Sequence, residues 1–565
     1  MQLKYLDTVL AVRNLKAPSL EALNPDSRLY EILLLQIQGD IEANISFIGN
    51  REQQLAFRKY ESFLDLASQK NIDLVVTPEY SCPWSVIDHI ISKGVFPNKQ
   101  KLWVLGCESI GRDELRHFIT THSQVFWIYE DELVNNEGKV GNFFDPLLYI
   151  FKTEDTNGNE KIIFTLQFKT THMSVHGSPL ERDNYIPGNL IYILRNDESS
   201  IYLLTLICAD SLGFRREQLT NKQQATLIMH IQMNPDPRGD NFKNYRNDLY
   251  ANKEEKKEIL CLNWAKSTNI ANVYDIDFAG SAHYVKTKEV DRRDEKINYN
   301  HEKGLYFTNW KSKKVNSYFF NSDEYVFHYR STKVLQDLGT PEQQKRTGPE
   351  MIETFIWDEN KWAGDIIPND GFLDLLKDTN LTDTVLNDLT YIDKERLIAL
   401  SSGEALMTDW HKPEILKFLI IDDQEKINKI TVTQDGKGEV QKERLQYLSL
   451  FSALMNDIIL CEDNFPGCIK DLVNGCSIGY VVPNFNHNLY SLNGNPPATV
   501  AYVGSTHEKL AKKIFDAMFS FLDEDSRRRL VVWFDKDRKL NIICSPPPEH
   551  DADLSEDIRS ITRGA

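Results

Sequence analysis

The chain has 565 residues, of which 41% are hydrophobic and 26% are charged, and its formal net charge is −18 at pH 7. This length exceeds what one hydrophobic core usually supports, so we expect two or three domains. The negative charge argues against a general nucleic-acid or membrane-surface binder, because such proteins need a basic field.

The first residues of the chain and its cysteines indicate the cellular compartment in which we expect the protein. The first stretch carries Lys4, Asp7 and Arg13 among short apolar runs, so we expect no signal peptide. No stretch approaches the ~18 apolar residues of a membrane span. The eight cysteines contain no C-x-x-C pair and no regular metal spacing. We therefore expect a cytoplasmic protein with reduced thiols, no membrane segment, no metal and no other cofactor.

Expected strands and helices alternate through the first part of the chain. The turn signal at 157–159 lies between two apolar runs and predicts a hairpin. The alternation as a whole is typical of an α/β fold. Strands are expected at 29–37, 71–77, 101–107, 124–129, 147–152, 162–168, 191–194, 201–207, 225–231, 259–264, 282–286 and within 303–330, and helices at 51–69, 215–224 and 241–256.

A domain boundary is expected at residues 336–350, which are polar and hold two Gly and two Pro. The first domain then covers 1–335 and the second 351–565. The second reads as an α+β domain, for which we expect a regulatory or recruiting role, and its acidic tail at 549–556 is predicted to be disordered. Its expected elements are helices at 444–461 and after a capping box at 505–508, a strand at 499–503, and a hairpin of 529–534 with 540–544.

Three apolar strands of the first domain each end in one reactive group. These groups are Glu79, Lys169 and Cys208. Sites in open α/β sheets form at such carboxyl ends, so the three side chains could converge on one pocket. Taken singly, each has a plainer interpretation: Cys208 as a packed thiol, Glu79 as a loop carboxylate, and Lys169 as a solvated charge.

In these residues the sequence resembles the nitrilase (carbon–nitrogen hydrolase) superfamily, which uses a Glu-Lys-Cys triad in this chain order. The resemblance covers about residues 28–330 and none of the C-terminal part. Two departures are that the Arg after the Cys-x-Asp motif comes late, at Arg215, and that the segment at 287–302 is long and charged. The matching motifs are Pro78-Glu79, Lys169 with His172, Cys208-Ala209-Asp210, Glu181 with Pro187-Gly188, and Gly280-Ser281.

The resemblance implies a four-layer α-β-β-α sandwich, a homodimer or higher assembly, and a small-molecule amide or nitrile substrate. It implies a cysteine hydrolase that acts on a non-peptide carbon–nitrogen bond through a thioester. Cys208 would be the nucleophile and Glu79 the base that takes the thiol proton. Lys169 and the backbone amide of Ala209 would stabilise the oxyanion, and Glu181 would orient Lys169 or the leaving amine.

Two other interpretations stay open at this point. The chain could be a non-catalytic scaffold that keeps the fold, although a scaffold has no need of Glu79, Lys169 and Cys208 together. It could also be a regulated effector, for example in antiviral defence, whose C-terminal region senses a partner. The substrate itself cannot be derived from these residues.

Overall fold

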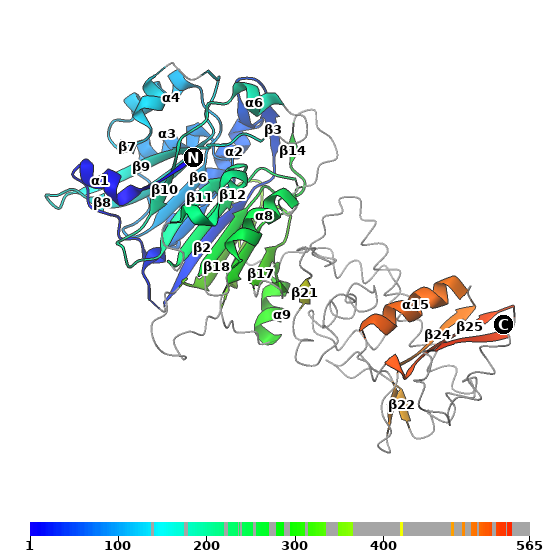
Figure 1. Ribbon diagram of the computed structural model, residues 1–565. Helices are drawn as coiled ribbons and strands as arrows, with labels where there is room; N and C mark the ends of the chain where they lie inside the picture. Colours follow the sequence, from blue (N-terminus) through cyan, green and yellow to red (C-terminus); the bar gives the residue numbers. More distant parts are fainter. Residues whose placement is uncertain are drawn as a thin grey trace. The chain divides into compact units, whose positions relative to one another are not determined.

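The computed structural model forms two compact units, one of Met1–Arg292 with Tyr299–Asp370 and one of Arg293–Asn298 with Gly371–Ala565. Figure 1 shows the elements of each unit. The residues that the structure describes are 1–26, 28–136, 140–173, 179–219, 224–235, 237, 240–251, 256–270, 278, 280–286, 294–310, 315–334, 348–364, 419–421, 476–478, 489–491, 499–505, 508–521, 527–537 and 539–544.

The first unit contains a mixed sheet that carries Glu79 and Lys169 after two of its strands, which we call the first sheet. Its central strands are parallel where a helix connects them and antiparallel in the hairpin of β8 with β9. Its order is β20 (Trp362–Ala363), β19 (Glu350–Trp357), β18 (Tyr325–Thr332), β2 (Leu29–Gln36), β5 (Leu74–Val76), β6 (Leu102–Gly106), β8 (Pro146–Glu154), β9 (Glu160–Phe168) and β7 (Phe126–Ile128).

A second mixed sheet carries Cys208 at the end of β11. Strands β11, β12 and β13 are parallel to one another, as continuous apolar strands of a buried sheet usually are. Within the first unit its order is β1 (Gln2–Tyr5), β10 (Leu190–Leu194), β11 (Tyr202–Ile207), β12 (Thr226–Ile231), β13 (Lys257–Leu262), β15 (Ala282–Lys286), β17 (Val315–Phe320) and β16 (Leu305–Trp310).

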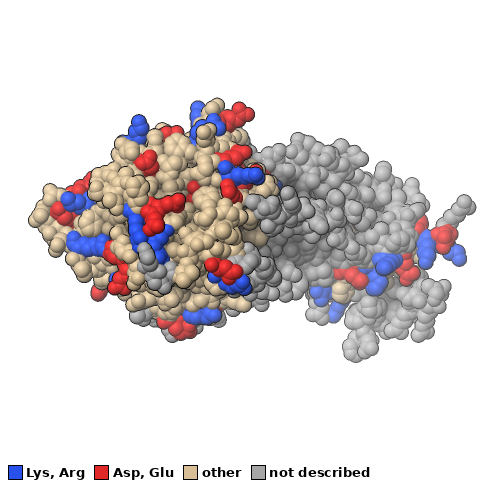
Figure 2. All heavy atoms as spheres, turned by 90° about the horizontal axis from the view of Figure 1, so that it is seen from above, with Lys and Arg blue, Asp and Glu red and all other residues tan. Residues whose placement is uncertain are grey.

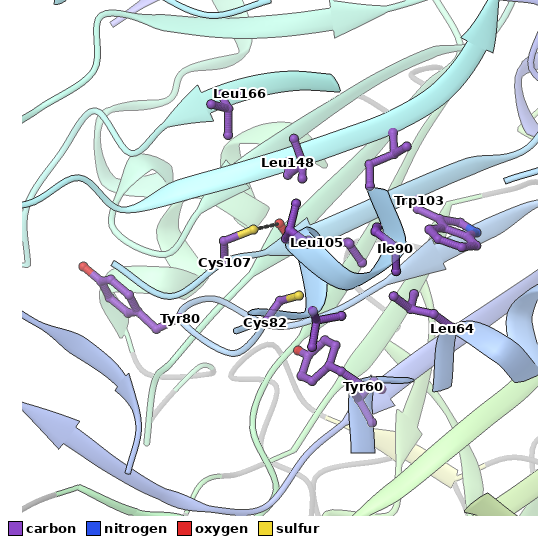
Figure 3. Packing of buried hydrophobic residues seen from close by; sticks show 14 of the residues in the cluster. Tyr60, Leu64, Tyr80, Cys82, Ile90, Trp103, Leu105, Cys107, Leu148 and Leu166 are labelled. Carbon is purple, nitrogen blue, oxygen red and sulfur yellow. Dashed lines mark hydrogen bonds between the residues drawn. The ribbon is translucent and has the colours of Figure 1, made fainter. Parts of the chain in front are cut away.

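Helices α2 (Gln53–Gln69) and α3 (Trp84–Lys93) cover one face of the first sheet. The apolar side of α2 contributes Leu64, which lies near Trp103 of β6, and Tyr60, which lies near Cys82 (Figure 3). Helix α3 is capped by Gly94, whose φ of +70° is the left-handed conformation that glycine adopts without a steric penalty. This packing holds β5 and β6 in position, and it therefore also positions the bend after β5.

The opposite face of the first sheet meets the second sheet. Gln167 of β9 donates from Nε2 to the carbonyl oxygen of Thr205 on β11 at 2.8 Å, and its Oε1 accepts from the amide of Tyr192 at 3.0 Å. On the far side of the second sheet, α8 (Asp240–Leu249) packs Phe242 and Tyr245 against the ring of His230. The layers are therefore helix, sheet, sheet and helix, with mixed α/β sheets.

Most of the remaining described elements are short. The helix expected at 215–224 is wrong in its described part, where a single 3-10 turn, Arg216–Gln218, follows α7. The other elements are α1 (Leu6–Val12), the 3-10 turn Glu21–Leu23, α4 (Arg112–Thr121), α5 (Asp131–Asn135), α6 (Pro179–Asn184), α7 (Asp210–Gly213), α9 (Asp294–Glu302), and a small sheet of β14 (Asn269–Ile270), β3 (Asp40–Ala43) and β4 (Ile48–Asn50).

The first unit extends further along the chain than the sequence indicates. Strand β19 pairs with β18 and β20 pairs with β19, although all of their residues except Glu350 lie in the range assigned to the C-terminal domain. The indole of Trp362 donates to the carbonyl oxygen of Lys59 on α2 at 2.8 Å. The polar stretch at 336–350 is thus followed by two more strands of the same unit, which reaches Asp370.

In the second unit, β24 (Thr499–Ser505) is parallel to β25 (Leu530–Lys536), and β25 forms a hairpin with β26 (Lys539–Cys544). Helix α15 (Glu508–Phe521) connects β24 to β25. The expected strand, helix and hairpin at this end are confirmed. The expected helix at 444–461 and the acidic tail lie outside the described residues. The short strands are β21 (Leu419–Ile421), β22 (Cys476–Ile478) and β23 (Leu489–Ser491).

Within the described ranges, no helix has the length and apolar character that crossing a membrane requires. On the face shown in Figure 2, basic and acidic side chains lie interspersed over the first unit.

Candidate active site

The three predicted reactive groups follow the ends of β5, β9 and β11. Glu79 lies in the bend after β5, and Lys169 follows the last residue of β9 directly. The side chains of both are only 1% exposed. Cys208 follows β11 directly and is 3% exposed. Glu79 and Lys169 are therefore not the solvated surface groups of their plainer interpretation, whereas burial by itself leaves the packed-thiol interpretation of Cys208 open.

Lys169 lies at the centre of a cluster of carboxylates. Its Nζ is 2.8 Å from Oε1 of Glu79, 2.7 Å from Oε1 of Glu181 and 3.5 Å from Oδ2 of Asp145. Burial alone would lower the pKa of Lys169, but the charges of Glu181, Glu79 and Asp145 together raise it well above its usual range. The ammonium is therefore permanently charged at neutral pH.

Glu181, on α6, is held on several sides. Its Oε1 accepts from Lys169 and from the hydroxyl of Tyr80 at 3.0 Å, and its Oε2 accepts from the amide of Met173 at 2.8 Å. Burial raises the pKa of Glu181, yet Lys169 and these donors outweigh that effect and lower it. Glu181 is thus an ionised carboxylate, positioned to hold Lys169 in place.

Glu79 is fixed by donors from the second sheet's side of the site. Its Oε2 accepts from the amide of Met233 at 2.7 Å, just beyond β12, and its carbonyl oxygen accepts from the indole of Trp264 at 2.8 Å. Burial raises the pKa of Glu79, and the charge of Lys169 offsets part of this increase. A carboxylate whose pKa is raised toward neutrality is suited to accept and return a proton.

Two glycines allow the backbone to approach closely at these positions. A Cβ on Gly106 of β6 would lie 2.1 Å from the carbonyl oxygen of Pro78, and one on Gly188 would lie 2.4 Å from that of Phe168. Pro78 precedes Glu79, and Phe168 precedes Lys169. Only glycine fits at both places without displacing the backbone that carries Glu79 or Lys169.

Cys208 has an unusual backbone conformation. Its φ is +40°, which is uncommon for a residue with a Cβ and is found where surrounding contacts enforce it. Its amide donates to the carbonyl oxygen of Ile231 at 2.8 Å. Its carbonyl oxygen accepts from Ser211 Oγ at 3.0 Å and lies 2.9 Å from Nε2 of His230. The backbone of the thiol residue is held from both sides.

The Cys208 thiol is in the electrostatic field of the cluster. Burial raises the pKa of Cys208 well above its usual range, the charge of Glu79 raises it further, and the charge of Lys169 lowers it. In the free protein Cys208 is therefore a neutral thiol, which must lose its proton before it can act as a nucleophile.

Asp210, two residues after Cys208, connects the ends of β9 and β11. Its Oδ1 accepts from the amide and hydroxyl of Thr170, each at 2.8 Å, and from the amide of Thr171 at 3.0 Å, while Oδ2 accepts from the amide of Ile207 at 3.2 Å. The carboxylate of Asp210 thus links, through hydrogen bonds, the two residues after Lys169 to the residue before Cys208.

Sequence reasoning missed Asp145. The residue directly precedes β8, where Pro146 pairs with Phe168, so Asp145 stands opposite Lys169. The amide of Lys169 donates to the carbonyl oxygen of Asp145 at 3.0 Å. The predicted hairpin could have identified this residue. Its last pair is Pro146 with Phe168, and the next pair in the same register is Asp145 with Lys169.

One group of acidic side chains among the described residues has spacing that would suit a metal ion. Oxygens of Glu79, Asp145 and Glu181 lie within 4.8 Å of one another. The ammonium of Lys169 contacts all three, so a cation of the chain itself already lies among these carboxylates.

Comparison with known proteins gives structural matches only. No family model and no curated protein matches the chain. An amidase from Nesterenkonia sp. is 13% identical over 47% of this chain and 85% of its own, with a TM-score of 0.28. A CN-hydrolase superfamily protein from Xanthomonas campestris is 15% identical over 45% of this chain and 82% of its own, with a TM-score of 0.27.

A third match, a glutamine-dependent NAD+ synthetase from Acinetobacter baumannii, is 11% identical over 56% of this chain and 49% of its own, with a TM-score of 0.31. The structural neighbours thus include nitrilase-superfamily amidases and a carbon–nitrogen hydrolase, at low identity and low TM-score.

Proposed function

We propose that the chain is a cysteine-dependent hydrolase of a non-peptide carbon–nitrogen bond, of the amidase or nitrilase type. The observation that carries the proposal is the buried Lys169, paired with Glu79 and Glu181, in the field of the Cys208 thiol. A buried cluster of this composition is costly to assemble for stability alone. It supplies a nucleophile, a base and a fixed positive charge in one place.

For an amide substrate, the first half-reaction needs one proton to move twice. Glu79 takes the proton of Cys208, and the thiolate sulfur attacks the carbonyl carbon. Lys169 and the amide of Ala209 stabilise the oxygen that becomes negative. Glu79 then returns the proton to the departing nitrogen, the carbon–nitrogen bond breaks, and a thioester on Cys208 remains.

The second half-reaction uses water in place of the thiol. Glu79 removes a proton from the water molecule, whose oxygen attacks the thioester carbon, with the same oxyanion contacts. The carbon–sulfur bond breaks, Cys208 regains its proton from Glu79, and the carboxylic acid leaves. The ionised Glu181 would keep Lys169 in position through both steps.

The α-β-β-α sandwich of the nitrilase type, a homodimer or larger assembly, and a regulatory role for the C-terminal domain expected at 351–565 are further parts of the proposal. The sandwich and the assembly follow from the resemblance of the sequence motifs, and the regulatory role follows from the different pattern of elements in the C-terminal part. The layer order and the two units are compatible with them.

The test is ammonia release from a panel of aliphatic and aromatic amides and nitriles, with untargeted metabolite profiling where the panel gives no turnover. Cys208→Ala is the matched control, and circular dichroism checks that it is folded. We expect turnover and an acyl adduct by intact mass only with Cys208 present. Equal turnover by the Cys208→Ala protein would exclude the covalent mechanism.

A further inference from the structure

Three carboxylates surround one ammonium in this site, which leaves the cluster with an excess of negative charge if all three are ionised. Glu79 and Glu181 contact Lys169 at 2.8 Å and 2.7 Å, whereas Asp145 is more distant at 3.5 Å. The Asp145 side chain is 1% exposed, so water does not compensate for the excess.

The surroundings of Asp145 Oδ2 indicate that the Asp145 carboxyl group carries a proton. This oxygen is buried and accepts no hydrogen bond from any described donor. An ionised carboxylate in such a place would lose the solvation of a charged atom, whereas a protonated one has only a hydroxyl to satisfy. Oxygens of Asp145 and Glu79 lie within 4.8 Å of each other, and two buried carboxyl groups this close are favoured when one of them carries a proton.

We propose that Asp145 is a positioning residue, which carries a proton at neutral pH and donates it in a hydrogen bond to Glu79. The cluster around Lys169 then holds two negative charges instead of three. Glu79 stays ionised and oriented, which leaves it free to act as the base. The protonation of Asp145 does not depend on the proposed function, but the role of Glu79 as the base does.

The surroundings of Asp145 agree with a neutral acid. Burial and the charge of Glu79 raise the pKa of Asp145 well above its usual range, against the effect of Lys169, and Glu181 raises it further. Tyr80 and Tyr185 also lie in the field of Asp145, and burial raises the pKa of both phenols, so they are neutral. The charged groups that face Asp145 are thus Glu79, Glu181 and Lys169.

The direct test is infrared spectroscopy of the full-length protein with carbon-13 in the aspartate carboxyl groups. At about pH 8, above the pKa of about 6 that burial gives Asp210, we expect the carbonyl band of a protonated aspartic acid. Asp145→Asn should remove this band. A wild-type spectrum with only carboxylate bands from aspartate would overturn the proposal, and this measurement needs no turnover and no variant.

A second measurement uses the rate at which iodoacetamide alkylates Cys208, read by peptide mass spectrometry. An asparagine keeps a donor to Glu79 and is neutral, like the protonated acid, so Asp145→Asn should change the rate less than about threefold. If Asp145 were ionised, the substitution would remove a negative charge beside the thiol. The alkylation rate would then rise by about tenfold or more, since one pKa unit corresponds to tenfold in thiolate.

Two further variants complete the test. Asp145→Ala removes the donor and should slow ammonia release from an accepted amide more than Asp145→Asn does. Glu108 is a matched control, because burial raises its pKa to about 7 while its carboxylate accepts hydrogen bonds from Asn50 and Gln53. Glu108→Gln should leave the Asp band unchanged. A protonated Asp145 without any amide turnover would refute the proposed function and leave the proton assignment standing.

Discussion

His230 and Cys208 are joined by a contact that fixes the backbone of the thiol residue: Nε2 of the imidazole lies 2.9 Å from the carbonyl oxygen of Cys208. A carbonyl oxygen accepts, so Nε2 carries the hydrogen, and Nδ1 accepts from the hydroxyl of Tyr245 at 2.7 Å. Burial lowers the pKa of His230 to about 3, so the ring is neutral across the physiological range.

This neutral histidine gives the first prediction, which concerns stability. In the unfolded chain a histidine titrates near 6.5, whereas in the fold it does so near 3. Between pH 3 and pH 6.5 the unfolded state binds more protons than the folded state does. The contribution of His230 to the free energy of unfolding is therefore complete above about pH 6.5 and is lost as the pH falls. From pH 6.5 to 5 the loss attributable to His230 is about 2 kcal/mol.

The measurement is urea unfolding of the wild type and of His230→Gln, whose side-chain amide can still donate to Cys208. We expect the wild type to lose more of its free energy of unfolding over this interval than the variant, by roughly the 2 kcal/mol above. Parallel losses in the two proteins would show that His230 does not stay neutral.

The second prediction separates the acidity of the thiol from turnover. The charge of Glu79 raises the pKa of Cys208 and that of Lys169 lowers it. Glu79→Gln should therefore speed alkylation of Cys208 by iodoacetamide at neutral pH, and Lys169→Ala should slow it, each by about tenfold. Both variants should nevertheless lose at least about a hundredfold in ammonia release, because each removes a group needed in the proposed reaction.

Double variants with Cys208→Ala give the control for this prediction. If the three groups act as a unit, neither Glu79→Gln nor Lys169→Ala should reduce turnover further in a protein that lacks the thiol. Additive losses would indicate that the groups do not share a site.

A third prediction concerns Asp210, which accepts four hydrogen bonds from residues beside Lys169 and Cys208. Asp210→Ala leaves buried donors without acceptors, and each such group costs about 1–3 kcal/mol. We expect a lower melting temperature together with slower turnover. Asp210→Asn keeps one acceptor oxygen and should lie between the alanine variant and the wild type. An unchanged melting temperature for Asp210→Ala would contradict the role of this carboxylate.

The fourth prediction concerns where the first unit ends. Because β19 and β20 belong to it, a fragment of residues 1–370 should be soluble and should react at Cys208 with iodoacetamide as the full chain does. A fragment of residues 1–340 lacks the buried Met351 and Trp362 and exposes the edge of β18, so it should aggregate. Equal behaviour of the two fragments would show that β19 adds nothing to the stability of the unit.

How far the sequence predicts this arrangement depends on whether a signal is local. The apolar runs at 71–77 and 162–168 correspond to strands, and the hairpin with its turn at Gly158 is confirmed. Glu79, Lys169 and Glu181 were each predicted as site residues, and their ion pairs lie in the structure as described above. Their catalytic roles stay predictions.

The features that the sequence did not predict depend on contacts between distant segments. The positive φ of Cys208, its contact with His230 and the place of β19 arise from pairings across the two sheets. Asp145 is an intermediate case. Its pairing with Lys169 could be predicted from the register of the hairpin, whereas its burial could not. The helix expected at 215–224 failed because short polar stretches beside a strand end carry little periodicity.

The close approach of Gly106 to Pro78 has a consequence for how variation in this chain would be interpreted. A change of Gly106 to alanine adds only one methyl group, to a strand, and alters no ionisable or nucleophilic side chain. It nevertheless forces apart the backbone that carries Glu79. In a saturation screen we expect Gly106 to tolerate substitution as poorly as Glu79, Lys169 and Cys208 do. A naturally occurring homologue with a side chain at this position would be expected to lack the proposed activity even where its Glu, Lys and Cys remain.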